Sequence, residues 1–583
     1  MKRGLQILFL LGVLAFMAGC RGGGGDVTLR IVATSDVHGR IFDTDCLDGE
    51  VRPGSLAKFS SFLRQQRKEY RNVIYLDAGD MLQGSVEMYQ DVTAQFERTS
   101  LAAQALNLLG CDAMVMGNHD FAVGGNSYDR FFRGLEFPLL GANAFFEQYG
   151  DYMTPFRILE IQGLKVAVLG FTTPVINYSI PKDRLELDLA PIREAAEHWM
   201  PVIKDEIKAD VVIGLMHSGL EDGRMDDEGL YENAVSQVVG SVPGFDVVIY
   251  GHDHKPRCFK MTDCNGDSVL LLNPGAFAAN AAVATLNVSF DESGRPQVLT
   301  SGSLEDITEE VPDSRFMKKL SGWYDDVRNY SDSIIGAVKV TMDGSGVLWR
   351  RSSMMDYVHQ IQMGFNGAQI SLTLPAFTKP SVPCGRLQIR DLFAIYQFDN
   401  NMVGVMLKGS EVKDILEYSA GLYYNTVADA TGPMLRYVTD ENGTRTPQTP
   451  CGRLVTAAGI EYVIDVTKPE GSRVDIISFT DGTEFKPDAY YRTTVNTFLY
   501  SSPESAVFKA TGLTHKDLAR RFITSSQADI RYFMLTNLAL AYETDRAVTV
   551  RPVSDWKLVP EDVVSECLSK DTIQFSILKN RMH

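Results

Sequence analysis

The chain has 583 residues, of which 45% are hydrophobic and 22% are charged, so it can bury more than one core and we expect two or more domains. Its net charge of -18 at pH 7 argues against a general nucleic-acid binder, because such proteins are usually basic, and we expect no nucleic-acid polymer as a partner. Any anionic ligand must be attracted by local positive charge rather than by the field of the whole protein.

The amino terminus has the organisation of a bacterial export signal. Lys2 and Arg3 give it a positive start, and the apolar run at residues 5–17 is too short to span a bilayer reliably. Met-Ala-Gly before Cys20 resembles a lipobox, which predicts cleavage before Cys20 and lipid attachment to its thiol; an ordinary signal cleavage site is the alternative. The glycine-rich residues 21–25 suit a flexible tether. We therefore expect a lipid-anchored protein of the bacterial cell envelope, in the periplasm by default or exposed at the surface.

Five short apolar runs, typical of strands buried on both faces, each end in a polar motif. The runs are residues 29–34, 73–76, 113–116, 211–215 and 247–250. The motifs are Asp36-Val37-His38-Gly39, Gly79-Asp80, Gly117-Asn118-His119-Asp120, His217-Ser218 and Gly251-His252-Asp253-His254, which hold five of the 9 histidines. Helical spacing between the first two runs, with Ser55 as a candidate N-cap, predicts alternating strands and helices. We therefore expect a layered α/β sheet whose motifs gather at the carboxyl ends of the strands, where such sheets bind ligands.

These motifs offer carboxylate, imidazole and amide-oxygen ligands, which suit divalent Zn, Mn, Fe or Co. Two-metal sites of this kind hold their ions roughly 3.5–4 Å apart and act on phosphate esters or amides. One carboxylate must bridge the ions, and we assign that role to Asp80. The remaining ligands divide into one set for each ion: Asp36, His38 and His254 for the first, and Asn118, His217 and His252 for the second.

A single Asp or His at a strand end is more often a cap or a satisfied core group than a ligand. The convergence of the whole set favours a metal centre, because metal clusters require several donors in one place. His119 is the one motif histidine outside the two ligand sets, and it remains available for chemistry. The histidines outside the motifs, among them His359, are expected to be ordinary structural residues.

In this order, the five motifs resemble those of the calcineurin-like metallophosphoesterase superfamily. The resemblance implies a layered α/β sandwich in which two metal ions activate a water as hydroxide for in-line attack on phosphorus. His119 would offset charge on the phosphoryl oxygens and protonate the leaving alkoxide as a general acid. In the nucleotidase branch this His is oriented by the Asp of Gly-Asn-His-Glu-Phe-Asp, but Ala122 occupies that position here. We expect Asp120, or a carboxylate elsewhere, to take over.

The expected domain organisation follows from changes along the chain. Residues 26–305 would form the metallophosphoesterase domain. Residues 306–334 contain a charged helical stretch, which predicts a linker helix or, alternatively, a helix packed permanently on one domain. Residues 335–560 would form a second domain, and residues 561–583 a tail without a motif that we can interpret. Residues 1–25 would be the signal peptide and tether.

The second half also carries a resemblance. Phe398-Asp399-Asn400 and the apolar run 403–409, which ends in Gly, resemble the C-terminal domain of the 5′-nucleotidase and 2′,3′-cyclic-nucleotide 2′-phosphodiesterase/3′-nucleotidase family. The resemblance implies an α+β domain that holds a nucleoside, with its base between two aromatic rings, and a domain rotation that carries the phosphate to the metals. Phe398 is the candidate for one ring, and a core aromatic at a strand end is the alternative.

The second ring and the substrate anchor depart from the family pattern. The glycine-rich element that normally precedes the second ring is missing from residues 498–505, so Tyr500 or Phe508 are the substitutes. Residues 366–371 read Asn-Gly-Ala-Gln-Ile-Ser where the 5′-nucleotidase branch has Asn-Gly-Gly-Gly-Ile-Arg. The change removes an Arg that would anchor phosphate or carboxylate, and the string is closer to that of the cyclic phosphodiesterase branch.

Together these features predict a lipid-anchored, metal-dependent hydrolase of nucleotides in extracytoplasmic nucleotide salvage. It would act as a 5′-nucleotidase or as a 2′,3′-cyclic phosphodiesterase/3′-nucleotidase. One alternative is a hydrolase of another phosphorylated or sulfur-containing small molecule. A second alternative is a non-catalytic surface binding protein that retains the metal domain, although a scaffold would have no need of His119.

Overall fold

The computed structural model describes most of the chain after its first 25 residues. The described residues are 26–93, 98–123, 125–146, 153–174, 176, 187–221, 231–427, 432–441, 443, 445–544 and 547–570. The predicted lipidation site Cys20 and residues 571–583 lie outside them. Among the described helices, none combines the length and the hydropathy that a membrane crossing requires.

Two sheets form the centre of the N-terminal half. One has the order β15-β14-β1-β2-β3-β4-β6 and the other β12-β13-β11-β10-β8-β7. The strands of the first are Pro296–Asp306, Asn280–Phe290, Val27–Thr34, Val73–Asp77, Ala113–Val115, Leu139–Leu140 and Met153–Thr154, in that order. The strands of the second are Arg257–Thr262, Ser268–Asn273, Val247–Tyr250, Val211–His217, Leu164–Thr172 and Phe156–Ile161. Crossovers join the parallel pairs, and antiparallel strands such as β14, β15, β12 and β7 lie toward the edges.

The two sheets pack face to face because alternate residues of each strand point to opposite faces. In β1, Ile31 points into the core between the sheets, whereas Val32 packs on the outer helical layer. In β8, Val166 and Val168 likewise enter the inner core, and Ala167 packs on the helices outside the second sheet. The predicted layered α/β sandwich is confirmed as a four-layer arrangement of helices, two sheets and helices.

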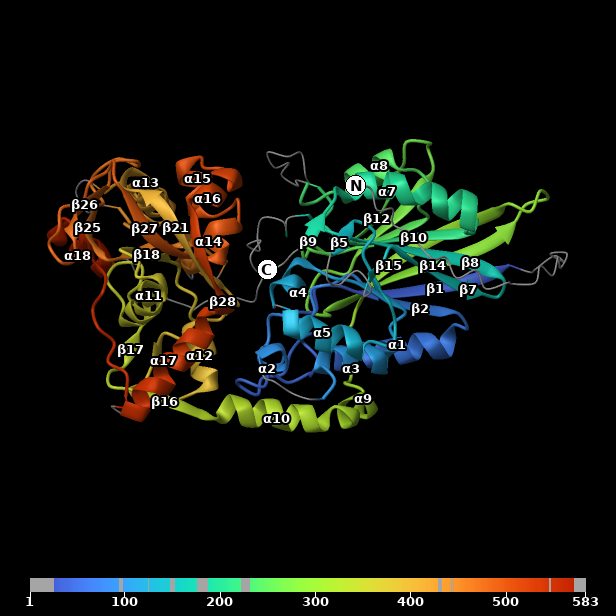
Figure 1. Ribbon diagram of the computed structural model, residues 1–583, viewed down its shortest axis with the longest axis horizontal. Helices are drawn as coiled ribbons and strands as arrows, with labels where there is room; N and C mark the ends of the chain where they lie inside the picture. The colour runs from blue at the N-terminus through green and yellow to red at the C-terminus, as the bar shows by residue number, and fades with distance from the viewer. Residues whose placement is uncertain are drawn as a thin grey trace, which may run out of the picture.

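Helices cover both outer faces of the sandwich (Figure 1). The first sheet is covered by α1 (Leu56–Glu69), α2 (Val86–Thr93), α3 (Leu101–Leu109) and α5 (Gly125–Gly134), and the second by α7 (Ile192–Pro201) and α8 (Val235–Ser241). Ser55 caps α1, where its hydroxyl accepts the backbone N–H of Lys58, as its position before the apolar helical face predicts. The short strands β5 (Ala144–Phe146) and β9 (Leu187–Leu189) form a separate antiparallel pair.

Two consecutive helices connect the halves of the chain. They are α9 (Ser314–Lys319) and α10 (Ser321–Asp332), and Figure 1 shows α10 running along one side of the molecule from one half to the other. The first sheet ends at Asp306, and the next strand begins at Ile334. Trp323 and Val327 of α10 are buried, so this connection is packed against the protein rather than extended in solvent. The predicted domain limits themselves stay predictions.

The C-terminal half mixes a larger sheet, smaller sheets and helices, as the α+β prediction requires. Its larger sheet has the order β24-β18-β27-β21-β28, and a smaller one the order β26-β25-β29. Their strands are, in the same order, Thr456–Ala458, Ile370–Thr373, Tyr490–Asn496, Asn401–Lys408 and Phe522–Asp529, then Val474–Phe479, Ile460–Asp465 and Asp555–Val559. Short pairs are β16 (Ile334–Val338) with β20 (Gly385–Gln388), β17 (Met342–Asp343) with β19 (Ser381–Val382), and β22 (Tyr437–Thr439) with β23 (Arg445–Pro447). The helices are α11 (Ser353–Asn366), α12 (Ile389–Ile395), α13 (Gly409–Tyr423), α14 (Thr497–Ser501), α15 (Ala506–Thr511), α16 (His515–Arg521), α17 (Ile530–Thr544) and α18 (Glu561–Lys570).

One hydrophobic cluster continues from the first half into the second. It includes Tyr89 of α2 and Trp323 of α10 together with Phe393 of α12 and Met534 of α17. A separate cluster, formed by residues such as Tyr462 and Leu416, is the core of the C-terminal sheet region alone. Burial of apolar surface therefore holds the two halves together, and their contact is close to the ends of β1 and β2.

Candidate metal centre

The seven predicted ligands lie at the carboxyl ends of strands or in the loops directly after them. They are Asp36 and His38 after β1, Asp80 after β2, Asn118 after β3 as the first residue of α4 (Asn118–Ala122), His217 at the end of β10, and His252 and His254 after β11. The pairs β1–β2, β2–β3 and β10–β11 are parallel. Because parallel strands end at the same edge of a sheet, the fold brings all seven residues to one edge of the sandwich.

Asp36, His38 and His254 form a first group of donor atoms that lie within 4.8 Å of one another. The Nε2 atoms of His38 and His254 are 3.2 Å apart. The Nε2 atom of His254 is also 3.2 Å from Oδ1 of Asp36. This is the set that the sequence assigns to the first ion.

A second group joins Asp36 to Asp80 and His217, again within 4.8 Å. The Nε2 atom of His217 lies 3.3 Å from Oδ2 of Asp80 and 3.1 Å from Oδ1 of Asn118. The same Asn118 oxygen is 2.9 Å from Nδ1 of His252. Asp36 is thus common to both groups, and the assignment of the bridge to Asp80 stays a prediction.

The tautomers of two histidines fit these groups to cations. The Nδ1 atom of His38 lies 3.0 Å from the carbonyl oxygen of Gln83, and Nδ1 of His217 lies 2.7 Å from the carbonyl oxygen of Ala78. A carbonyl only accepts, so each Nδ1 carries hydrogen and each Nε2 is the ring nitrogen that faces the neighbouring donor atoms. Lone pairs and carboxylate oxygens directed at one another are favourable only with a positive charge between them. The residues therefore fit divalent cations.

Five of the predicted ligands have a left-handed backbone, which is uncommon outside glycine. Their φ values are 50° for Asp36, 50° for His38, 60° for Asp80, 76° for His252 and 55° for His254. Such conformations cost on the order of 1–3 kcal/mol each and cluster at functional sites. Such positions persist only where the surrounding structure holds them, as the packed sheets beneath these loops do here.

Two motif glycines are required by close approach to the ligands. A Cβ atom at Gly117 would lie 2.1 Å from Oδ1 of Asp80 and 2.6 Å from Cε1 of His217. A Cβ atom at Gly251 would lie 1.9 Å from Oγ of Ser35 and 2.5 Å from Oδ2 of Asp36. The glycines of these motifs are therefore part of the donor geometry, because no side chain fits between the loops.

Charge is unevenly distributed within the site. Burial raises the pKa of Asp36, but a hydrogen bond from His254 and nearby histidines outweigh it and hold that pKa below its usual value. Burial likewise lowers the pKa of His217, yet the Asp80 carboxylate raises it to about 10. For His38 burial dominates and lowers the pKa to about 4. Protein interiors tolerate such buried carboxylates only beside positive charge, which protons supply here and which divalent ions would replace.

His119 projects from α4 beside the ligands and is exposed, which leaves its ring accessible to a substrate. Its backbone N–H donates to Oδ1 of Asp80 at 2.8 Å, and its ring centroid lies 5.3 Å from that of His38. Its Nδ1 atom lies 2.6 Å from Oε1 of Gln83. His119 therefore lies next to the predicted ligands. Because Nδ1 contacts Gln83, Nε2 is the ring nitrogen that remains for a substrate.

The prediction that Asp120 orients His119 is wrong. Both carboxylate oxygens of Asp120 accept backbone N–H groups, Oδ2 from Asp80 and Gly117 and Oδ1 from Met81 and Leu82. Burial and the nearby Asp80 raise the pKa of this carboxyl to about 6. At the start of α4 the carboxylate of Asp120 is engaged by the loop after β2 and by the residue that precedes the helix. Asp120 thus supports the Asp80 loop, and the group at Nδ1 of His119 is the Gln83 amide.

Sequence reasoning also missed Gln83, Glu232 and Phe277. Oε1 of Glu232 lies 3.0 Å from Nε2 of His252, so it orients a predicted ligand. The Phe277 ring packs on the rings of His38 and His254, with centroid separations of 5.7 and 5.8 Å. None of the three stands in a motif that identifies a ligand, although Gln83 follows Asp80 by only three residues.

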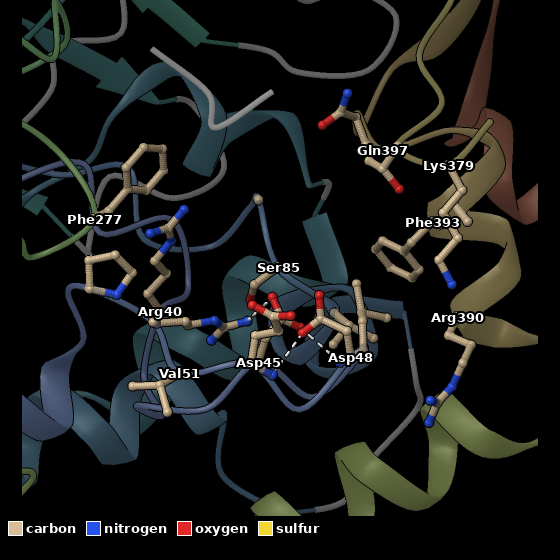
Figure 2. Close-up of a pocket in the computed structure, with 18 residues that line it drawn as sticks. Arg40, Asp45, Asp48, Val51, Ser85, Phe277, Lys379, Arg390, Phe393 and Gln397 are labelled. Carbon is tan, nitrogen blue, oxygen red and sulfur yellow. Dashed lines mark hydrogen bonds and ion pairs between the residues drawn. The ribbon is translucent and has the colours of Figure 1, made fainter. Parts of the chain in front are cut away.

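A cleft of about 290 Å³ lies between the two halves, beside this site. Figure 2 shows Phe277 and Arg40 on its N-terminal side and Phe393 and Lys379 on its C-terminal side. The Arg40 guanidinium lies over the Phe277 ring, 3.9 Å from its centroid. Since Phe277 also contacts two predicted ligands, the cleft opens next to the donor groups and combines aromatic with cationic side chains.

The three aromatic candidates of the C-terminal half lie in different surroundings. Phe398 is partly buried and packs against the cluster that continues from the N-terminal half. Tyr500 is 7% exposed in the separate C-terminal core, and its ring lies 6.2 Å from that of Phe522. Phe508 packs on His515, with ring centroids 4.5 Å apart. Phe398 is thus the candidate beside the contact between the halves, and the stacking roles of all three stay predictions.

Residues 366–371 are engaged in hydrogen bonds within the C-terminal half. Oδ1 of Asn366 accepts from Thr494, and the Ser371 hydroxyl pairs with Nδ1 of His359 at 2.9 Å. His359 is fully buried and its other ring nitrogen meets the Thr456 hydroxyl at 3.1 Å, so it is the structural residue that its position outside the motifs predicts. This string therefore serves the fold in the present arrangement.

Two protein-family models match the chain. The calcineurin-like phosphoesterase model covers residues 29–256, and the model of the 5′-nucleotidase C-terminal domain covers residues 334–510. The first match begins within β1, ends just before β12 and includes every predicted metal ligand. The second begins at β16 and spans the three aromatic candidates.

Curated proteins with similar sequences include nucleotide hydrolases. The trifunctional nucleotide phosphoesterase protein YfkN of Bacillus subtilis is 25% identical over 491 residues, which is 76% of this chain but 33% of that protein. The chain thus spans about a third of that relative. A 2′,3′-cyclic-nucleotide 2′-phosphodiesterase/3′-nucleotidase of Haemophilus influenzae is 24% identical over 92% of this chain and 88% of its own length.

Among solved structures, one titled as a 5′-nucleotidase from Staphylococcus aureus has the same fold. Its TM-score is 0.70 at 19% identity, over 91% of this chain and 100% of that one. At this identity the likeness shows the fold alone. It extends across both halves, so the two-domain architecture as a whole is shared.

Proposed function

Because the chain belongs to the calcineurin-like phosphoesterases that carry a 5′-nucleotidase C-terminal domain, we propose that it hydrolyses phosphate esters of nucleotides. Members of this family are metal-dependent hydrolases of phosphoric esters, and this chain is one of them. The observation that carries the substrate proposal is the combination of the converging donor groups with the C-terminal domain of the nucleotidases. We propose Zn, Mn, Fe or Co as the ions, because the donors are imidazole, carboxylate and amide oxygen.

When bound, two divalent ions polarise the phosphoryl group and lower the pKa of a water molecule. Asp36, His38 and His254 would hold one ion, and Asp80, Asn118, His217 and His252 would complete the pair. Ala78 and Gln83 fix the tautomers of His217 and His38 through their carbonyl oxygens, and Glu232 orients His252. These contacts pre-organise the donors before substrate arrives.

His119 would act at the ester oxygen. The water loses one proton to solvent as its oxygen bonds to phosphorus. As the bond from phosphorus to the ester oxygen breaks, the His119 imidazolium gives its Nε2 proton to that oxygen and is reprotonated from solvent afterwards. Its Nδ1 atom keeps its hydrogen on Gln83 throughout. The products are an alcohol and a phosphate, or a phosphomonoester when the substrate is a cyclic diester.

The C-terminal half would bind the nucleoside. We propose Phe398 as one stacking ring, supported by its place beside the interdomain contact. Stacking of a base on such a ring contributes about 1–3 kcal/mol and tolerates any base. The absence of Arg from residues 366–371 favours the 2′,3′-cyclic diester over the 5′-monoester as the preferred substrate, because a diester carries less charge to be anchored.

We further propose that the protein acts outside the cytoplasm, lipid-anchored through Cys20. The proposal rests on the signal-like amino terminus and the glycine-rich tether. Metabolic labelling with a palmitate analogue should mark the wild-type chain and leave a Cys20→Ser variant unmarked. If neither protein is labelled, the lipid-anchor proposal is wrong, whereas the hydrolase proposal is unaffected.

A hydrolysis panel tests the substrate. The metal-loaded protein is assayed with 5′-AMP, 3′-AMP, 2′,3′-cyclic AMP, a nucleotide sugar and a non-nucleotide phosphodiester. We expect turnover of nucleotides, with the cyclic diester preferred. Faster turnover of the non-nucleotide ester would contradict the nucleotide assignment, and no turnover of any ester would favour a binding protein.

A further inference from the structure

The loop Gln83–Gly84 contacts the catalytic histidine on one side and the C-terminal half on the other. Oε1 of Gln83 lies 2.6 Å from Nδ1 of His119. The Gln83 Nε2 atom donates to the carbonyl oxygen of Asp399 at 3.4 Å, and the backbone N–H of Gly84 donates to Oδ2 of Asp399 at 2.9 Å. Two residues of the metal domain thus join His119 to one residue of the other domain.

In this series of contacts, from Asp399 through Gln83 to His119, each donor faces an acceptor. The amide nitrogen of Gln83 faces a carbonyl oxygen, which can only accept, so the amide oxygen must face His119. An amide oxygen also only accepts, so Nδ1 of His119 carries the hydrogen and Nε2 is the atom presented to a substrate. Gln83 therefore fixes both the ring orientation and the tautomer of His119.

The backbone of the same loop supports a predicted ligand. The carbonyl oxygen of Gln83 accepts from Nδ1 of His38 at 3.0 Å. Gly84 has φ 112°, and a Cβ atom there would lie 2.9 Å from Cβ of His38, so the loop has little room to move toward the metal site. Since the backbone holds His38 and the side chain holds His119, a substitution at Gln83 separates the two roles.

Asp399 is itself held by a buried cation. Arg531 is 1% exposed and pairs with Asp399 and with Asp529. Its guanidinium lies 4.6 Å from the centroid of the Tyr89 ring, in the metal domain, and 4.2 Å from that of the Phe393 ring. The Tyr89 hydroxyl also donates to Asp529. A buried charge with these partners costs far more to displace than an exposed one, so Asp399 is fixed when the two halves are docked.

We propose that Gln83 is the positioning residue of His119, in place of the aspartate that Ala122 has displaced, and that Asp399 makes this positioning depend on docking of the C-terminal domain. The proposal rests on the proposed function. It goes beyond that function in assigning to the substrate domain a second role, which is to hold the general acid of the other domain in its productive orientation.

Esters with different leaving groups distinguish a positioning role of Gln83 from a merely structural one. An alkoxide needs a proton from His119, whereas 4-nitrophenolate leaves with little help. Gln83→Ala should lower kcat by roughly 10–100-fold for 2′,3′-cyclic AMP or 5′-AMP, the range typical of lost orienting partners, and change kcat for 4-nitrophenyl phosphate far less. KM and bound metal should be unchanged, because the side chain touches no predicted ligand. Gln83→Glu, which keeps an acceptor oxygen, should recover part of the loss.

Asp399 variants test the dependence on docking. Asp399→Ala should reproduce the leaving-group pattern of Gln83→Ala, whereas Asp399→Asn keeps an acceptor for Gly84 and should retain most of the rate. Asp48→Asn is the matched control, because Asp48 is exposed on the same cleft and its carboxylate accepts from its own loop at Glu50. Equal losses on both classes of ester, or wild-type rates in Gln83→Ala, would overturn the proposal.

A readout without turnover separates this inference from the proposed function. With ¹⁵N-labelled histidine, the metal-loaded protein should show His119 protonated at Nδ1, and this signal should change in Gln83→Ala and Asp399→Ala but persist in Asp48→Asn. A protonated Nδ1 that is insensitive to Gln83 would overturn the positioning role even if hydrolysis is fast. Failure of the wild-type protein to hydrolyse any ester would instead contradict the proposed function.

Discussion

The metal site and the candidate base site differ in how strictly their chemistry fixes the residues. A metal site needs lone pairs from specific atoms within a few ångströms, and the seven predicted ligands converge from both sheets with five left-handed backbones. Base stacking needs only a flat ring with one free face. Accordingly, the three aromatic candidates divide between the cluster that joins the two halves and the separate cluster of the C-terminal half. Catalytic chemistry is therefore better defined in this chain than substrate recognition.

Removing the general acid should have the largest effect on the catalytic side of that contrast. We expect His119→Ala to lower kcat for an alkyl ester by roughly 10²–10⁴-fold, the usual contribution of general acid catalysis. The metal content should stay the same, because His119 is not among the donor groups. Steady-state kinetics and elemental analysis of the same preparation check both statements. A loss of metal in this variant would mean that His119 is a ligand.

Crowding the ligands should have the next largest effect. Gly117→Ala would place a methyl group 2.1 Å from Oδ1 of Asp80, so Asp80 or His217 must move, and displacements of this size cost roughly 100-fold in rate. We expect lower metal affinity as well, measured by titration with a chelator. Gly364→Ala is the control, since its Cβ would meet nothing within 4 Å in α11. Equal behaviour of the two variants would contradict the tight packing of the site.

On the recognition side, Phe398→Ala should raise KM for nucleotides by roughly 10-fold, within the 1–3 kcal/mol range of base stacking. The KM for 4-nitrophenyl phosphate, which has no base, should change little. Phe508→Leu serves as the comparison, because Phe508 packs on His515 in the other cluster. If Phe508→Leu weakens nucleotide binding and Phe398→Ala does not, the base stacks on Phe508 instead of Phe398. The difference between the well-defined metal site and the poorly defined base site is then larger.

The smallest effect concerns the stability of the C-terminal domain. Burial lowers the pKa of His359 to about 3, so between that value and the unfolded value of about 6.5 the unfolded state binds more protons. The free energy of unfolding should therefore fall as pH drops below about 6.5, by up to roughly 1.4 kcal/mol per pH unit from this residue. Urea unfolding of the metal-free protein at several pH values measures the slope.

His359→Gln should flatten that slope, and His198→Gln, at an exposed position, is the control for the substitution itself. An unchanged slope in His359→Gln would show that acid sensitivity comes from other residues, such as the carboxylates of the metal site.

The sequence predicted the sandwich and the gathering of its polar motifs because strand ends, glycines and ligand types are all local features. It predicted the role of Asp120 incorrectly because adjacency in sequence does not fix direction: one turn of α4 aims that carboxylate at the backbone of the Asp80 loop. Gln83 could not be identified from the sequence, since a glutamine residue does not indicate which group its side-chain amide will contact. Its role depends on Asp399, more than 300 residues away.

Metal stoichiometry coupled to activity tests the central claim most directly. The metal-stripped protein should be inactive, and titration with Mn²⁺ or Zn²⁺ should restore hydrolysis of 2′,3′-cyclic AMP as about two equivalents bind per chain, as expected for a two-metal site. Asp80→Asn should bind fewer ions and remain slow at saturation. Full activity without metal, or saturation of the wild-type protein at a single equivalent, would contradict a dinuclear phosphoesterase centre built from the five motifs.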